Sequence, residues 1–155
     1  MLPLCSLSLK GPELKLGLQF YNSGRPTTAV CHAPAVFRDA KDNRTGKHIL
    51  QGREATAFSN AEEDQTGKGH CKSSYRPTLG VLACLLTDLF MDAVIPKANL
   101  PEHALTASGA IYKKAAQPWG ECVCVSADEN GILITGQNPA SAAGVGKALI
   151  KVLNL

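Results

Sequence analysis

The chain has 155 residues, of which 45% are hydrophobic and 19% charged, and its net charge is +3. This is enough sequence for one domain with its own core, and the composition excludes a disordered chain. The basic residues form no block and are not interleaved with aromatic residues, so nucleic acid is not an expected partner. No segment is long and apolar enough to predict a membrane span, and the start resembles no signal peptide, so we expect a cytoplasmic protein.

Residues 12–22 predict a helix, because Pro12 suits a first helical turn and apolar residues recur at helical spacing. The turn residues 22–24 end this helix, and the β-prone run 27–30 follows. Helix, turn and strand in this order are typical of α/β proteins with parallel strands.

Cys31 follows that strand directly, and we expect a sharp turn there that exposes its thiol. Small residues, Ala29 and Ala33, flank the cysteine at two positions' distance, and Pro34 favours the start of a helix. A helix N-terminus stabilises a thiolate, and His32 can transfer protons near neutral pH. The alternative is a buried, structural cysteine beside an exposed histidine.

Two strands and a helix are predicted next, over residues 48–51, 54–58 and from residue 61 onward. Ser59 or Asn60 can cap this helix, whose acidic first turn suits the helix dipole. Because the acidic turn follows a strand, it should lie at the sheet edge that carries Cys31.

The C-terminal part predicts a β-hairpin and a helix. Residues 121–126 and 132–135 flank the turn sequence Asp-Glu-Asn-Gly at 128–131, a strong hairpin signal. An alanine-rich helix should span residues 140–153, with Asn138 as its N-cap. The fold class predicted for the whole chain is therefore α/β.

Other residues that could carry chemistry have structural interpretations. The six cysteines include no Cys-x-x-Cys pair, so we expect no metal site, and Cys122 and Cys124 should share a core face. Trp119 is expected to be a packing anchor at a strand start. The histidines at positions 48, 70 and 103 lack metal-ligand spacing and are expected at the surface.

A candidate catalytic cluster remains, in which Cys31, His32 and the acidic turn 62–64 come together. A thiol nucleophile needs a base nearby, and the base needs a third group that orients it.

Four segments resemble the ThiJ/PfpI family of the class I glutamine amidotransferase-like superfamily, in the right order: 29–37 (AVCHAPAVF), 52–63 (GREATAFSNAEE), 118–120 (PWG) and 133–142 (LITGQNPASA). The heat-shock-type, glutathione-independent glyoxalases (glyoxalase III) are the most similar branch. The resemblance implies a flavodoxin-like parallel sheet and a triad of Cys31, His32 and Glu63, with Glu62 as the neighbouring alternative.

The implied activity converts a small aldehyde such as methylglyoxal to lactate through a cysteine hemithioacetal, without a metal or organic cofactor. A non-enzymatic protein with a redox-sensing or chaperone-like role is the alternative, and a PfpI-type cysteine peptidase is a weaker one. A homodimer is compatible with each of these hypotheses.

The chain departs from the family pattern in three ways. Residues 1–10 match nothing in the family, so residues 11–155 are interpreted as a partial domain that lacks the first βα units and their glutamate. Ala33 replaces the usual glycine after the histidine. Residues 69–92 resemble an insertion, for which a retained intron is our hypothesis.

Overall fold

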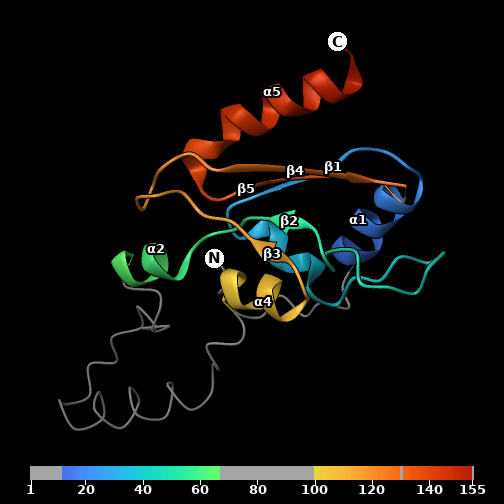
Figure 1. Ribbon diagram of the computed structural model, residues 1–155, viewed down its shortest axis with the longest axis horizontal. Helices are drawn as coiled ribbons and strands as arrows, with labels where there is room; N and C mark the ends of the chain where they lie inside the picture. Colours follow the sequence, from blue (N-terminus) through green and yellow to red (C-terminus); the bar gives the residue numbers. More distant parts are fainter. Residues whose placement is uncertain (1–11, 67–99, 130, 155) are drawn as a thin grey trace, which may run out of the picture.

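The computed structural model describes residues 12–66, 100–129 and 131–154 (Figure 1). The unmatched segment 1–10 and the suspected insertion 69–92 lie outside the described residues.

The main sheet has three strands in the order β1-β5-β4. Strand β1 (Thr27–Val30) runs parallel to β5 (Gly131–Gly136), and β4 (Val123–Asp128) pairs antiparallel with β5. The predicted strand at 27–30 and the predicted C-terminal hairpin are both confirmed. Leu133 and Ile134, which point to opposite faces of the central strand, are both buried, so each face of the sheet is covered.

A second, two-stranded sheet joins β2 (Glu54–Ala55) to β3 (Ile111–Tyr112) in parallel. The strand predicted over 54–58 is thus only partly formed, and the strand predicted over 48–51 is wrong. His48 forms only an isolated bridge with Lys41, and residues 49–51 form a turn in which Ile49 and Leu50 are both buried. Adjacent side chains of a strand point to opposite faces, whereas a turn can place both in the core.

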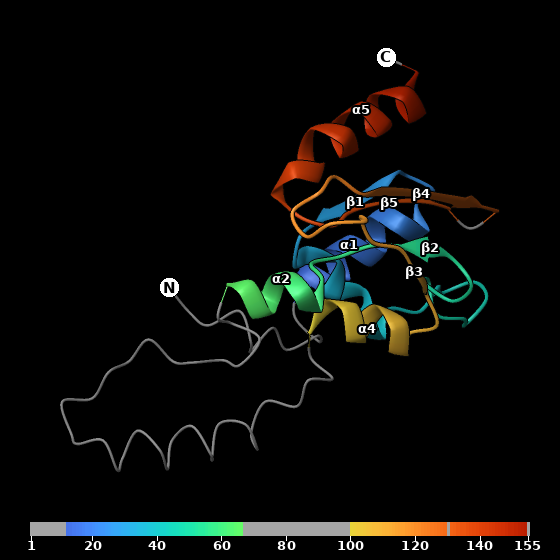
Figure 2. The same ribbon diagram turned by 60° about the vertical axis from the view of Figure 1, so that its left-hand side comes forward.

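Helices cover both faces of the main sheet (Figures 1 and 2). Helix α5 (Ala142–Leu153) packs on one face, and α1 (Pro12–Asn22) lies against the other. Helix α4 (Pro101–Ala107) is on the same side as α1 but packs on residues 33–39 and on β3. The predicted helix 12–22 is confirmed, and the layered arrangement agrees with the predicted α/β class. Gly136 lets α5 approach the sheet, because a Cβ there would lie 2.8 Å from a methyl carbon of Val145.

The helix predicted from Pro34 is a short 3-10 helix, η2 (Ala33–Asp39), rather than an α-helix. Hydrogen bonds between residues three apart close it, from the Ala35 N–H to His32 and from the Ala40 N–H to Phe37. The sequence predicted that the N-terminus of an α-helix would lie beside the Cys31 thiol. The structure has a short 3-10 helix there, so η2 does not supply an α-helix dipole.

The predicted helix 140–153 begins with a 3-10 turn, η4 (Pro139–Ser141), and its N-cap is Ser141. Asn138 occupies the N-cap position of η4, as predicted, but its side chain makes no capping bond, because it bonds to Glu62. Within the part of the chain that the structure describes, every helix is too short or too polar to span a bilayer.

Candidate active site

Cys31 is the turn residue between β1 and η2. Its φ angle is 65°, in the left-handed region that non-glycine residues rarely occupy. The Cys31 N–H donates to the Gly136 carbonyl and its own carbonyl accepts from the Phe58 N–H, both at 2.9 Å. The left-handed conformation costs about 1–2 kcal/mol. These two hydrogen bonds hold the backbone in it. The thiol is thereby fixed at the carboxyl end of β1, and Cys31 is half-buried.

The side chains of Cys31, His32 and Glu63 form a continuous chain of contacts. The Cys31 Sγ lies 3.2 Å from His32 Nδ1. On the other side of the ring, His32 Nε2 donates to Glu63 Oε1 at 2.7 Å. Glu63 is only 3% exposed, so its carboxylate faces the imidazole rather than solvent. The structure brings together the three residues that the sequence pointed to, and their catalytic roles remain a prediction.

The electrostatic environment favours a positively charged His32. Its pKa is raised from 6.5 to about 9, first by the hydrogen bond with Cys31 and then by the one with Glu63, while burial opposes the rise. The ring is therefore an imidazolium at neutral pH. His32 therefore places a positive charge beside the Cys31 sulfur, 3.2 Å from its Nδ1.

Helix α2 (Asn60–Gln65) carries Glu63, and a capping box fixes where it starts. The Ser59 side chain accepts from the Glu62 N–H, while the Glu62 carboxylate accepts from the Ser59 N–H. The predicted Ser59 cap is one of the two alternatives and is confirmed. Of the acidic turn, Glu63 contacts His32, whereas Asp64 is exposed to solvent.

Glu62 is fully buried and makes five hydrogen bonds that the sequence analysis did not anticipate. Its Oε1 accepts from the Trp119 N–H at 2.9 Å and from Asn138 Nδ2 at 2.7 Å. Its Oε2 accepts from the N–H and hydroxyl of Ser59 and from Gln137 Nε2. Burial raises the pKa of Glu62, but these donors outweigh burial and keep it below the ordinary value. The Ser-x-x-Glu spacing is the sequence signal for the bonds between Glu62 and Ser59.

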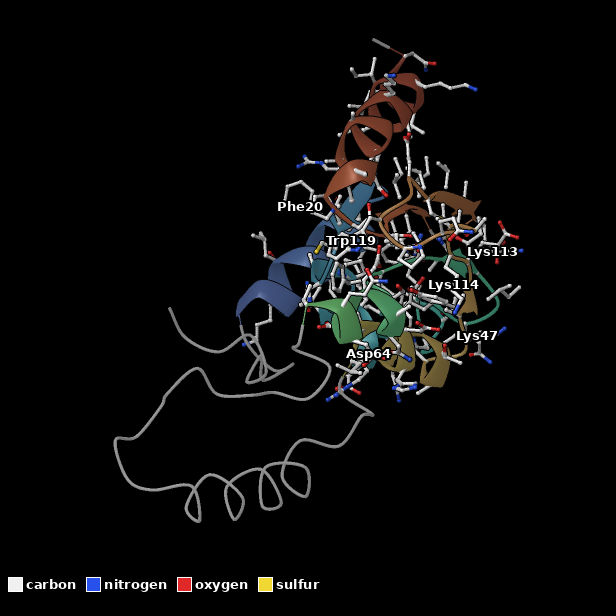
Figure 3. The ribbon with its side chains drawn as sticks, turned by 90° about the vertical axis from the view of Figure 1, so that its left-hand side faces the viewer. Phe20, Lys47, Asp64, Lys113, Lys114 and Trp119 are labelled. Carbon is white, nitrogen blue, oxygen red and sulfur yellow. The ribbon has the colours of Figure 1, made fainter. Side chains whose placement is uncertain are left out.

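An aromatic row lies beside the imidazole. The Phe58 ring stacks on His32 with 4.5 Å between centroids, and Trp119 meets Phe58 edge-on at 5.5 Å. Trp119 is not at a strand start, because β4 begins at Val123, so the prediction of a strand-start anchor is wrong. Figure 3 shows Trp119 on the α2 side of the molecule, and its indole N–H donates to Gln65 at 2.6 Å.

Of the other cysteines and histidines, Cys122, Cys124, His48 and His103 are described by the structure and form no part of this cluster, whereas the cysteines at 5, 71 and 84 are outside the described residues. Cys124 is buried, as predicted, and burial raises its pKa to about 12; Cys122 is half-buried. His48 and His103 are half-buried rather than at the surface, and His48 bonds to the Arg38 carbonyl. Across the described residues, no group of three or more histidine, cysteine, aspartate or glutamate side chains could hold a metal ion. His70 is outside the described residues.

Comparison with known proteins finds relatives among the glutathione-independent glyoxalases. No protein-family model matches the chain. The probable glutathione-independent glyoxalase hsp3103 of Schizosaccharomyces pombe is 30% identical over 141 residues, which are 90% of this chain and 44% of that protein. Glyoxalase 3 of Candida albicans is 27% identical over 138 residues, 88% of this chain and 47% of that protein. The glutathione-independent glyoxalase HSP31 of Saccharomyces cerevisiae is 29% identical over 126 residues, 80% and 42% respectively.

A solved structure agrees with these relatives. The crystal structure of glyoxalase III from Candida albicans matches with a TM-score of 0.63 and 25% identity, over 89% of this chain and 47% of that chain. The chain thus spans about half the length of the proteins it matches.

Proposed function

Because this chain is a homologue of the glutathione-independent glyoxalases, consistent with the glyoxalase III branch of the ThiJ/PfpI family, we propose that it converts methylglyoxal to lactate without glutathione. The observation that carries the proposal is the contact chain from the Cys31 sulfur through His32 to the Glu63 carboxylate. This arrangement pairs a nucleophile with a proton carrier and an orienting acid.

The proposed reaction is an internal oxidation and reduction of the substrate. The Cys31 thiolate adds to the aldehyde carbon, and the resulting oxyanion takes the proton of the His32 imidazolium, which gives a hemithioacetal and a neutral His32 that can act as a base. His32 then removes the hydrogen of that carbon as a proton, and an enediol forms. Return of a proton to the neighbouring carbon yields a thioester, so the aldehyde carbon is oxidised and the ketone carbon is reduced. Water hydrolyses the thioester, releasing lactate and the free thiol, with no external oxidant or cofactor.

Glu63 has an orienting role in this proposal. Its carboxylate accepts the hydrogen bond of His32 Nε2, so Nδ1 is the ring nitrogen that faces the sulfur and the substrate. The left-handed backbone at Cys31 serves as a nucleophile elbow, which presents the sulfur at the end of β1. We also propose that the sheet is flavodoxin-like and that two chains pair. The protein is proposed to be cytoplasmic and to have a role in stress response.

One observation favours a second candidate function. Cys31 is a free, half-buried cysteine whose sulfur contacts His32, so it remains partly accessible to an oxidant. A redox-sensing or chaperone-like protein would use these properties without turnover. A peptidase of the PfpI type is less well supported, because such enzymes typically draw their acid from a neighbouring subunit, whereas Glu63 contacts His32 within this chain.

Lactate formation from methylglyoxal by the purified chain, in glutathione-free buffer with a chelator, tests the proposal. We expect turnover by the wild type and a loss on the order of 10³-fold or more in Cys31→Ser, because the serine hydroxyl remains protonated beside His32. Wild-type protein that forms no lactate but whose Cys31 oxidises reversibly would support the redox alternative. Cleavage of casein would support the peptidase instead.

A further inference from the structure

We propose that Trp119 is a specificity-determining residue, which forms one wall of the substrate site and limits the size of the aldehyde's substituent. The inference rests on the proposed function and names a property of the same site that the triad does not explain.

Two independent sets of contacts link Trp119 to residues that adjoin the triad. The first runs through Phe58, whose ring stacks on His32 on one side and meets the indole edge-on on the other. Phe58 is buried and its N–H is bonded to the Cys31 carbonyl, so this row is fixed to the turn that carries the thiol.

The second set runs through helix α2. The Trp119 backbone N–H donates to Glu62, and its indole N–H donates to Gln65. These two acceptors flank Glu63 in the sequence, one residue before it and two after it. The indole therefore lies along the helix that presents the triad carboxylate.

Core packing does not explain this arrangement, because Trp119 is 43% exposed. Its φ angle is 64°, a conformation that is strained for a bulky residue. A large apolar side chain that is held by two hydrogen bonds in a strained backbone, yet remains open to solvent, is preorganised for contact with another molecule.

The chemistry of the wall sets the class of substrate. The exposed indole of Trp119, backed by the buried Phe58 ring that stacks on His32, offers a rigid apolar surface, which suits the methyl end of methylglyoxal but restricts a bulky substituent. Removing the indole should open room for an aromatic 2-oxoaldehyde. Since one methylene in an apolar pocket changes the specificity constant by roughly 10–200-fold, the loss of an indole should shift the preference by at least about 10-fold.

The test is the ratio of the specificity constants (kcat/KM) for phenylglyoxal and methylglyoxal, measured by mandelate and lactate formation. We expect Trp119→Ala to raise this ratio at least about 10-fold over wild type, and Trp119→Phe, which keeps an aromatic wall, to raise it less. Ile150→Ala is the matched control, because Ile150 is an exposed apolar residue of α5, and its ratio should equal that of wild type.

A second readout does not need turnover. Trp119 is the single tryptophan of the chain. Its fluorescence in Cys31→Ser should therefore change saturably when phenylglyoxal is added. An unchanged ratio in Trp119→Ala, or no fluorescence change, would overturn the inference while methylglyoxal turnover stands. Absence of wild-type turnover would instead contradict the proposed function.

Discussion

Replacing Glu63 by glutamine tests the electrostatics of the site directly. The substitution keeps the size of the side chain and an oxygen acceptor for His32 Nε2, but it removes the negative charge 2.7 Å away. The charge and its hydrogen bond are among the causes that raise the pKa of His32 to about 9. An opposite charge at this range shifts a pKa by about 1–3, so in Glu63→Gln the imidazole should titrate at least about one pH unit lower.

The raised pKa of His32 also predicts how the free energy of unfolding changes with pH. A histidine whose pKa is raised on folding, here from 6.5 to about 9, stabilises the folded state below pH 6.5, and this contribution is lost as the pH rises through 9. The difference corresponds to roughly 3 kcal/mol as an upper limit. Because the His32 side chain is 32% exposed, solvent screening should reduce it to about 1–2 kcal/mol.

Two measurements check this reasoning. An NMR titration between pH 5 and 11 gives the His32 pKa, with the resonance assigned by its loss in His32→Gln. Urea unfolding at pH 6.5 and above pH 9 gives the stability change, which should be smaller in Glu63→Gln than in wild type. Asp64→Asn is the matched control, because Asp64 is exposed beside Glu63 and its replacement should leave both results unchanged. A wild-type His32 that titrates near 6.5, or no change in Glu63→Gln, would refute the reasoning.

Three further predictions concern packing and reactivity. Gly136→Ala should lower the free energy of unfolding by about 1–3 kcal/mol in urea titration, because its methyl group would overlap Val145; an unaffected midpoint would show that α5 can shift freely. Glu62→Ala should lower that free energy by at least about 3 kcal/mol, because it leaves several buried donors unpaired, and an effect below about 0.5 kcal/mol would contradict the proposed anchoring. Iodoacetamide at pH 8 should alkylate Cys31 and spare Cys124, whose pKa is raised to about 12, as peptide mapping would show; equal labelling would contradict this difference.

The parts of the fold that the sequence predicted well depend on local signals. Helix α1 has a proline at its start and turn residues at its end, and the hairpin has an Asp-Glu-Asn-Gly turn between two β-prone runs. The Ser59 cap similarly depends on a spacing of three residues. Such signals are contained within a few residues, so no tertiary information is needed to read them.

The predictions that failed depend on contacts between distant residues. Residues 48–51 have strand propensity, yet Ile49 and Leu50 both enter the core from a turn. Asn138 has the sequence of an N-cap, but its side chain bonds to Glu62, which is 76 residues away. The prediction for Trp119 failed for the same reason, because its hydrogen bonds to Glu62 and Gln65 determine its position. Tertiary hydrogen bonds outweigh a local preference of about 1 kcal/mol.

The candidate site divides in the same way. Cys31 and His32 are adjacent in the sequence, whereas the acidic turn follows β2, which belongs to the second sheet and not to the sheet of β1 as predicted. The bond from the Phe58 N–H to the Cys31 carbonyl joins the segment before α2 to the turn that carries the thiol. Which of the two glutamates faces the imidazole could not follow from spacing, because the choice depends on the donors that surround Glu62. The structure places Glu63 at His32 and Glu62 among amide and hydroxyl groups.

The central claim is that Cys31 and Glu63 both act through His32 in a single reaction. The most direct test is a double-mutant cycle on lactate formation. The rate from methylglyoxal is measured for Cys31→Ser, Glu63→Gln and the double variant. We predict that the double variant is no slower than Cys31→Ser alone, because the orientation of His32 no longer affects the rate once the thiol is absent. Losses that multiply in the double variant, or turnover that persists in Cys31→Ser, would contradict the account.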